Sequence, residues 1–203
     1  KLDTVGKVLE GNEVKILEDG EILAKGELIM NGYWNDPEAT NKTIINGWVH
    51  TGDIGEFDDE NYLKITDRKK DIIVNAGGDN ISPSRIEAKL DIEPEIAQSM
   101  LYGDFKNYLV AIIVPNKELA LEWAKENNIE LNLSKIIIDE SYNKKIKEII
   151  DKVNSSLSAI EQIRKFILID HEFTIENNMM TPSMKVRRFK VKEKYKESLE
   201  KLY

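Results

Sequence analysis

The sequence of 203 residues contains no cysteine and only two histidines, His50 and His171. The absence of cysteine excludes disulfide bridges and thiolate metal sites. Two histidines are also too few for a metal site built from several imidazole ligands. Neither histidine has a base or a nucleophile close by in the sequence, so both are interpreted as structural. The sequence therefore predicts no metal site.

Long apolar runs are missing as well. No stretch approaches the roughly 18 apolar residues that span a bilayer, and no signal peptide is recognisable, so the default expectation is a cytoplasmic protein. The net charge of −8 makes the chain a poor general partner for nucleic acid, because phosphate contacts supply most of that affinity. An initiator methionine is lacking, and the chain opens at Lys1, which suggests a piece of a longer protein.

The first third of the chain consists of short apolar–polar alternations separated by turn residues. A short helix is predicted to begin at Pro37, a residue that fits the first helical position. Strands are predicted at 14–16, 21–24, 27–30, 48–50, 54–57 and 62–66. The last two of these strands form a hairpin across the turn at 58–61. This part of the chain is predicted to be a small β-rich unit.

After Asp71 the pattern changes to strands that alternate with helices. Strands are predicted at 72–74, 96–102, 108–114 and 166–169, and helices from 82–83, from 115–116, over 141–158 and over 190–202, with a loop at 174–180. This alternation indicates an α/β unit, so the whole chain is predicted to be α+β. The three tryptophans, Trp34, Trp48 and Trp123, are interpreted as packing anchors.

A run of charged residues from Asp67 to Asp71 lies where the two patterns meet. Charged side chains are costly to bury, so this junction is expected to be a solvated and mobile linker.

Three short motifs near this junction suit contact with a ligand, and each has a simpler structural interpretation. Asp53, in a Thr-Gly-Asp triplet, can accept hydrogen bonds from vicinal hydroxyls, but Gly-Asp is also a common turn. Arg68 offers a planar fork of donors for phosphate or ribose oxygens, although such a charge run is typical of a solvated surface. Gly77 and Gly78 permit close approach of a ligand to the backbone, or form an ordinary loop.

A fourth motif, TPSMKVRR, covers residues 181–188. Lys185 within it can reach an anionic reacting centre and neutralise developing charge. The simpler interpretation is a basic surface helix. This leaves an alternative function, a non-catalytic module that binds an anionic membrane or nucleic acid through residues 185–194.

Four stretches occur together in one order: VGKVLEGNEVKI, GELIMNGYWNDPEAT, GWVHTGDIGEFDDENYLKITDRKKDIIVNAGGDNISPSRIE and TPSMKVRR. In this order they closely resemble the C-terminal part of AMP-forming acyl-CoA synthetases, of the adenylate-forming superfamily. The stretch from 172 to 203 resembles the long-chain fatty-acid branch most. The resemblance covers essentially the whole chain. It implies an acid–thiol ligase that converts a fatty acid or another carboxylic acid to acyl-AMP and then to a coenzyme A thioester.

The resemblance also implies roles for individual residues. Asp53 and Arg68 match the residues that contact the ribose of the nucleotide, and Lys70 falls at the hinge position. Gly77 and Gly78 match glycines beside the tunnel for the pantetheine arm of coenzyme A. Lys185 matches the lysine of the adenylation step, although Met184 stands where the superfamily usually has glycine.

By the same resemblance, residues 1–67 are the last, β-rich subdomain of a large N-terminal domain. Residues 68–70 are the hinge, and 71–203 form the mobile C-terminal domain. The partners implied are ATP, Mg²⁺, coenzyme A and a carboxylic acid. Nucleic acid is not expected as a partner, and peripheral contact with a membrane is compatible with the resemblance. The phosphate loop, the magnesium-linked glutamate and the acyl pocket of the family are absent from this stretch. The isolated chain is therefore expected to be inactive.

Overall fold

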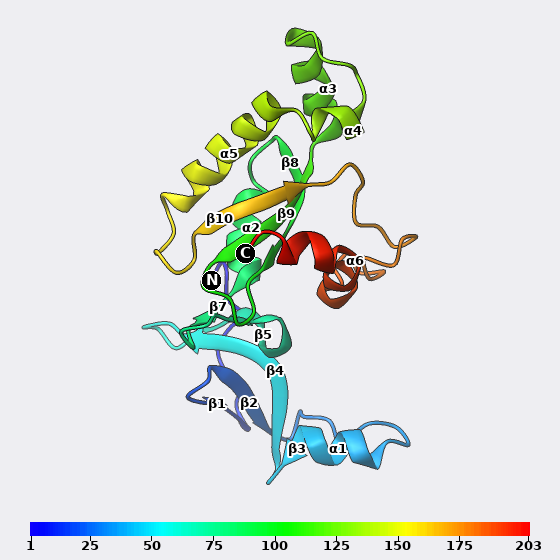
Figure 1. The fold of residues 1–203 in the computed structure, drawn as a ribbon. Helices are drawn as coiled ribbons and strands as arrows, with labels where there is room; N and C mark the ends of the chain where they lie inside the picture. The colour runs from blue at the N-terminus through cyan, green and yellow to red at the C-terminus, as the bar shows by residue number, and fades with distance from the viewer. The chain divides into compact units, whose positions relative to one another are not determined.

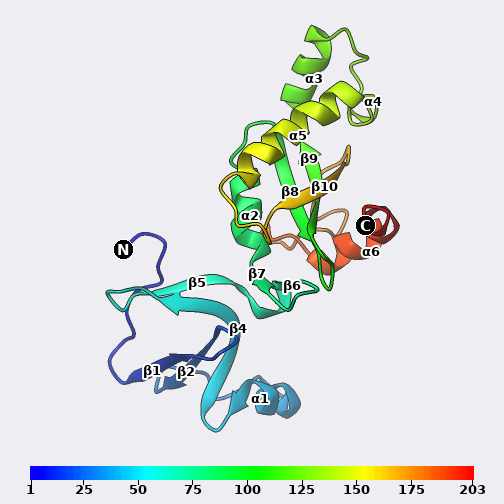
Figure 2. The same ribbon diagram turned by 60° about the vertical axis from the view of Figure 1, so that its left-hand side comes forward.

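The chain divides between Ile72 and Ile73 in the computed structural model, which describes all of residues 1–203 (Figures 1 and 2). The first unit, Lys1–Ile72, holds most of the short strands, and the second, Ile73–Tyr203, holds strands that alternate with helices. The predicted α+β class is therefore confirmed.

The first unit is built on a five-stranded sheet with the order β1-β2-β4-β3, and β5 also pairs with β4. All of its strand pairs are antiparallel. The elements are β1 (Asn12–Ile16), β2 (Glu21–Gly26), α1 (Pro37–Thr43), β3 (Ile44–Ile45), β4 (Trp48–Phe57), β5 (Leu63–Arg68) and the 3₁₀ turn η1 (Lys69–Asp71). The long strand β4 pairs with β2, β3 and β5 and is therefore the central strand of the sheet.

Two strand predictions in the first unit are wrong. Residues 27–30 form turn and bend structure instead of a strand, because the chain leaves the sheet at Gly26, whose φ of +146° suits glycine alone. Residues 48–50 and 54–57 belong to the single strand β4, which continues through the Thr-Gly-Asp triplet. The turn-forming residues there bend the strand, and the pairing register shifts between Ile54 and Gly55, but the strand does not end.

The second unit contains a three-stranded sheet with the order β10-β9-β8 and a separate two-stranded ribbon of β6 and β7. Its elements are β6 (Ile73–Val74), β7 (Asn80–Ile81), α2 (Pro83–Leu90), β8 (Ile96–Tyr102), β9 (Leu109–Pro115), α3 (Lys117–Glu126), α4 (Leu133–Ile136), α5 (Glu140–Asn154), β10 (Ile163–Leu168) and α6 (Arg188–Glu200). Strands β8 and β9 are antiparallel, whereas β10 runs parallel to β9 after the crossover through α3, α4 and α5.

The central strand β9 is buried along its whole length, because both faces of the sheet are covered. Side chains alternate between the two faces along a strand. Leu109, Ala111 and Ile113 join the cluster formed with α2 and α5, whereas Val110 and Ile112 join the cluster formed with α6 and the loop before it. Figure 1 shows α5 and α6 on opposite sides of this sheet.

The tryptophan prediction holds at one position and is wrong at another. The Trp123 ring packs against Tyr142 of α5 with centroids 4.9 Å apart. Trp34 is 91% exposed in the loop before α1 and anchors nothing. Trp48 is an intermediate case: its ring is half-buried, and the ammonium of Lys15 lies over it, 4.1 Å from the ring centroid.

Candidate active site

Asp53 and Arg68 are brought together by the pairing of β4 with β5, in which they are direct partners. Arg68 Nε lies 2.8 Å from Asp53 Oδ1. The positive φ of Gly52, +69°, bends β4 just before Asp53. Thr51 Oγ1 donates to the carbonyl of Ile22 at 2.6 Å and accepts from the Asp53 N–H at 3.1 Å. Thr51 thus holds the backbone at Asp53 and Arg68 contacts its carboxylate, while 20% of the Asp53 side chain stays exposed and accessible to a ligand.

A buried carboxylate, Glu21, supports this arrangement from β2. It is only 4% exposed and accepts the N–H of Gly52 at 3.1 Å. Its other oxygen lies 3.2 Å from His50 Nδ1 and accepts from Lys69 Nζ at 2.9 Å. Lys69 also pairs with Asp19 at 2.7 Å. Burial raises the pKa of Glu21, but the Lys69 ammonium, His50 and the Gly52 N–H together outweigh that effect, so the pKa is lowered.

Lys70 lies in the 3₁₀ turn η1, two residues before the division between the units. Its side chain is exposed. The turn is closed by the N–H of Ile72, which donates to the carbonyl of Arg68 at 3.2 Å. The role of residues 68–70 as a hinge stays a prediction, and so do the domain limits drawn from the sequence.

Gly77 and Gly78 form the exposed tip of the loop between β6 and β7. Asn75 Oδ1 accepts the N–H groups of Gly77 and Asp79, both at 2.9 Å, and so closes the loop. Gly78 has a φ of +88°, and a Cβ there would meet nothing within 4 Å. The need for glycine at this position is therefore conformational, while the open space beside it leaves the backbone accessible.

Lys185 lies on an exposed tight turn between residues 181 and 186. The N–H of Thr181 donates to the Lys185 carbonyl at 2.8 Å, and the Lys185 N–H donates to Thr181 Oγ1 at 3.1 Å. Met184 has a φ of +60°, in the left-handed region that favours glycine. Glycine, which the family resemblance leads us to expect here, adopts this conformation freely, whereas Met184 adopts it at a cost of about 1–2 kcal/mol.

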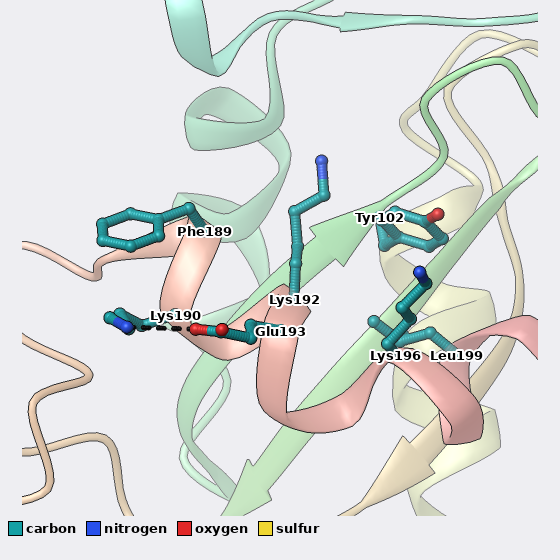
Figure 3. Close-up of a pocket in the computed structure, with 7 residues that line it drawn as sticks. All are labelled: Tyr102, Phe189, Lys190, Lys192, Glu193, Lys196 and Leu199. Carbon is teal, nitrogen blue, oxygen red and sulfur yellow. Dashed lines mark hydrogen bonds and ion pairs between the residues drawn. The ribbon is translucent and has the colours of Figure 1, made fainter.

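The positive charge of the basic segment 185–194 is partly compensated within its own unit. Lys190 pairs with Glu193 at 3.0 Å, and Lys192 pairs with Asp104. A groove of about 570 Å³ runs along this side of α6 and is lined by Tyr102, Phe189, Lys190, Lys192, Glu193, Lys196 and Leu199 (Figure 3). Because acidic partners neutralise two of its lysines, the segment is less basic than its sequence suggests.

Neither Glu21 nor the buried Glu87 stands out as a candidate in the sequence. Glu21 opens an ordinary strand, and its partners lie 29 to 48 residues away. One feature of the sequence could have indicated Glu87. It lies on the apolar face of α2 with Ile86 and Leu90, where a charged side chain needs a partner. No group of three or more His, Cys, Asp or Glu side chains is placed to hold a metal, and no helix is long and apolar enough to cross a membrane.

The folds of the two units match those of adenylate-forming enzyme domains. The family described as AMP-binding enzyme C-terminal domain matches residues 70–203. The chain belongs to this family, which confirms the resemblance inferred from the motifs.

Two curated relatives extend the similarity over the whole chain. The long-chain-fatty-acid–CoA ligase FadD15 of Mycobacterium tuberculosis is 37% identical over 100% of this chain and 34% of its own length. Human long-chain-fatty-acid–CoA ligase 6 is 32% identical over 98% of this chain and 31% of its own length. The chain thus spans about a third of the length of these relatives.

Solved structures show the same fold. The adenylation domain of a carboxylate reductase from Mycobacterium chelonae superposes with a TM-score of 0.81 at 27% identity, over 98% of this chain and 31% of that one. The corresponding domain from Segniliparus rugosus, in complex with AMP and a co-purified carboxylic acid, gives 0.75 at 27% identity, over 98% and 32%.

Proposed function

We propose that this chain is the C-terminal third of an ATP-dependent acid–thiol ligase of the long-chain fatty-acid type. The observation that carries the proposal is its match, from end to end, to proteins named as long-chain-fatty-acid–CoA ligases. In the first half-reaction, a carboxylate oxygen attacks the α-phosphorus of ATP and pyrophosphate leaves. In the second, the thiol of coenzyme A attacks the acyl carbon and AMP leaves.

Asp53 and Arg68 are proposed to hold the ribose of the nucleotide. The carboxylate is a strong acceptor for two vicinal hydroxyls, and the guanidinium beside it can donate to a ribose oxygen. Their fixed separation of 2.8 Å supports the proposal, because a ribose-binding pair must be preorganised to orient the reacting phosphate.

Lys185 is proposed as the catalytic residue of the first half-reaction. That step brings a carboxylate against a phosphate, so its barrier is lowered by a cation placed between the two anions. The Lys185 ammonium forms no ion pair within residues 1–203, which leaves it able to meet such a centre.

The remaining assignments concern the second half-reaction. Gly77 and Gly78 are proposed to line the path of the pantetheine arm, and Lys70 to be the pivot about which residues 71–203 turn between the two steps. The exposed glycine tip and the exposed Lys70 side chain support both assignments. Mg²⁺ is proposed for the full-length enzyme, with ligands outside these residues.

The decisive experiment separates the half-reactions in the full-length enzyme. Lys185→Ala is expected to reduce carboxylate-dependent pyrophosphate release by about 100-fold or more, while thioester formation from supplied acyl-AMP stays within about threefold. Lys117→Ala, at another exposed lysine of the same unit, is the matched control and should change neither step. Equal losses in both steps would contradict the assigned role of Lys185.

The purified chain of 203 residues gives a second test. It is expected to release no pyrophosphate from ATP in the presence of a fatty acid, because the phosphate loop and acyl pocket of the family are absent from it. Fatty-acid-dependent release by this chain alone would contradict that expectation.

The comparisons give the non-catalytic alternative no support. Peripheral contact with a membrane and a cytoplasmic location stay predictions for the enzyme. The contact is supported by the Phe189 ring, which is 64% exposed beside the lysines of α6. Co-sedimentation with anionic and with neutral vesicles tests it, and equal retention on both would contradict an electrostatic contact.

A further inference from the structure

The loop that carries Lys185 is long, and its two ends are fixed by different side chains. It runs from the end of β10 at Leu168 to the start of α6 at Arg188. Near its start, the amide side chain of Gln98 on β8 accepts the N–H of Phe173 at 2.7 Å and donates to the Phe173 carbonyl at 3.0 Å. Near its end, Arg188 meets Glu87 of α2.

The Glu87–Arg188 pair is buried and bidentate. The side chains of Glu87 and Arg188 are only 11% and 15% exposed. Arg188 donates to both carboxylate oxygens, and one of these bonds, from Nη1 to Oε1, measures 2.7 Å. Glu87 Oε1 also accepts the N–H of Leu101 on β8 at 2.6 Å. The pair therefore ties the first residue of α6 to both α2 and β8.

A short chain of backbone contacts connects this pair to Lys185. Arg188 follows Lys185 by three residues. The N–H of Arg187 donates to the Met179 carbonyl at 2.7 Å, and Val186 forms a β-bridge with Met180. Val186 and Arg187, whose backbones are held by these contacts, are the residues between Lys185 and Arg188, so we expect a shift of Arg188 to move Lys185.

Given the proposed function, we propose that Glu87 and Arg188 are positioning residues for Lys185 in the adenylation step. A planar guanidinium that bridges both oxygens of a carboxylate fixes orientation as well as distance, which a lysine cannot do. A mutation far from the reacting atoms that misplaces a catalytic group by about 1 Å can lower the rate by about 100-fold.

The test uses Glu87→Gln and Arg188→Lys in the full-length enzyme. Each is expected to lower carboxylate-dependent pyrophosphate release by about 10- to 100-fold. Thioester formation from supplied acyl-AMP should change by less than about threefold, since Lys185 is not used in that step. Arg188→Lys keeps the charge, so it decides the question if Glu87→Gln fails to fold in a thermal unfolding assay.

The matched control is Glu161→Gln. It breaks the ion pair of Glu161 with Arg85, a residue of the helix α2 that also carries Glu87. Neither residue forms a hydrogen bond or an ion pair with the Lys185 loop, so both half-reactions should stay within about twofold of the wild type. A double variant, Glu87→Gln with Lys185→Ala, supplies a readout that a purely structural role would not produce. If Glu87 acts through Lys185, the double variant should lose no more adenylation than Lys185→Ala alone.

Three results would overturn this inference alone: equal losses in both half-reactions for Arg188→Lys, no loss in Glu87→Gln, or additive losses in the double variant. If Lys185→Ala itself spares adenylation, the proposed function and this inference fall together. Selective and non-additive losses would establish the positioning role.

Discussion

Replacing Glu21 with glutamine removes one negative charge from the buried centre of the first unit and leaves the size of the side chain unchanged. Glutamine Oε1 can still accept the N–H of Gly52, which Glu21 binds at 3.1 Å. The other end of the amide is then an NH2 donor, which faces Lys69 at 2.9 Å and His50 at 3.2 Å in place of a carboxylate oxygen. This donor cannot accept from the Lys69 ammonium, so that hydrogen bond and its ion pair are lost.

The expected loss is about 1–3 kcal/mol in the free energy of unfolding of this unit at pH 7. A buried hydrogen bond to a charged group contributes about 1.5–3 kcal/mol, whereas a partly exposed ion pair contributes about 0–1 kcal/mol. Lys69 belongs to the second kind, because it is 45% exposed and keeps Asp19 as a partner. The larger share of the loss is thus expected from the buried hydrogen bonds of the Glu21 carboxylate, because Glu21 is only 4% exposed.

The pH dependence of this loss follows from the lowered pKa of Glu21. A carboxylate whose folded pKa lies below its unfolded value, about 4.3 for glutamate, stabilises the fold fully above that unfolded value. The stabilisation is lost as the pH falls through the folded pKa. The difference between the wild type and Glu21→Gln should therefore be full at pH 7 and shrink below about pH 4.

Urea denaturation of the chain measures this difference. A Trp123→Phe background leaves Trp34 and Trp48 as reporters, and both belong to the first unit. Glu13→Gln, at an exposed position of β1, is the matched control and should change the unfolding free energy by less than about 0.5 kcal/mol. A difference for Glu21→Gln that stays constant between pH 7 and pH 3.5 would refute the reasoning.

Three further predictions concern packing. Gly55→Ala should cost about 1–3 kcal/mol in denaturant unfolding, because its Cβ would lie 2.3 Å from the Lys64 carbonyl and 2.6 Å from Ile22 Cδ1; an unchanged midpoint would contradict this. Ile112→Ala, in the fully buried strand β9, should cost about 2–5 kcal/mol by the same measurement, and a loss below about 1 kcal/mol would show that the site collapses around the smaller side chain. Trp34→Ala should stay within about 0.5 kcal/mol, since the ring is 91% exposed; a larger loss would mean that the ring is buried in solution.

Much of the second unit could be predicted from the sequence, because its elements are defined by local periodicity. The run 108–114 is predicted to be a strand, and the structure has the strand β9 at Leu109–Pro115. The apolar spacing within 141–158 predicts the helix α5, whose buried face includes Ile146, Ile150 and Val153. The predicted helix extends four residues too far, since the helix ends at Asn154, whose side chain pairs with the backbone of Ile163.

The first unit was harder to predict because its strands depend on pairing across the sheet. The Thr-Gly-Asp triplet has the composition of a turn, yet β4 passes through it, since the edges of β2 and β5 supply its hydrogen bonds. Residues 27–30 have the composition of a strand, yet no strand pairs with them. Local propensity is overridden wherever the sheet offers, or withholds, a partner.

The sequence by itself determined the family and most elements of the second unit, and it named candidate residues for the site. Asp53, Arg68, Gly77, Gly78 and Lys185 come from short motifs, and their roles stay proposals. Only the tertiary structure decided what holds them in place. Glu21 gathers Gly52 and Lys69, and Glu87 gathers Leu101 and Arg188, from positions as far as 101 residues apart. A buried charge must find partners wherever the fold brings donors to it, and no local pattern records where that is.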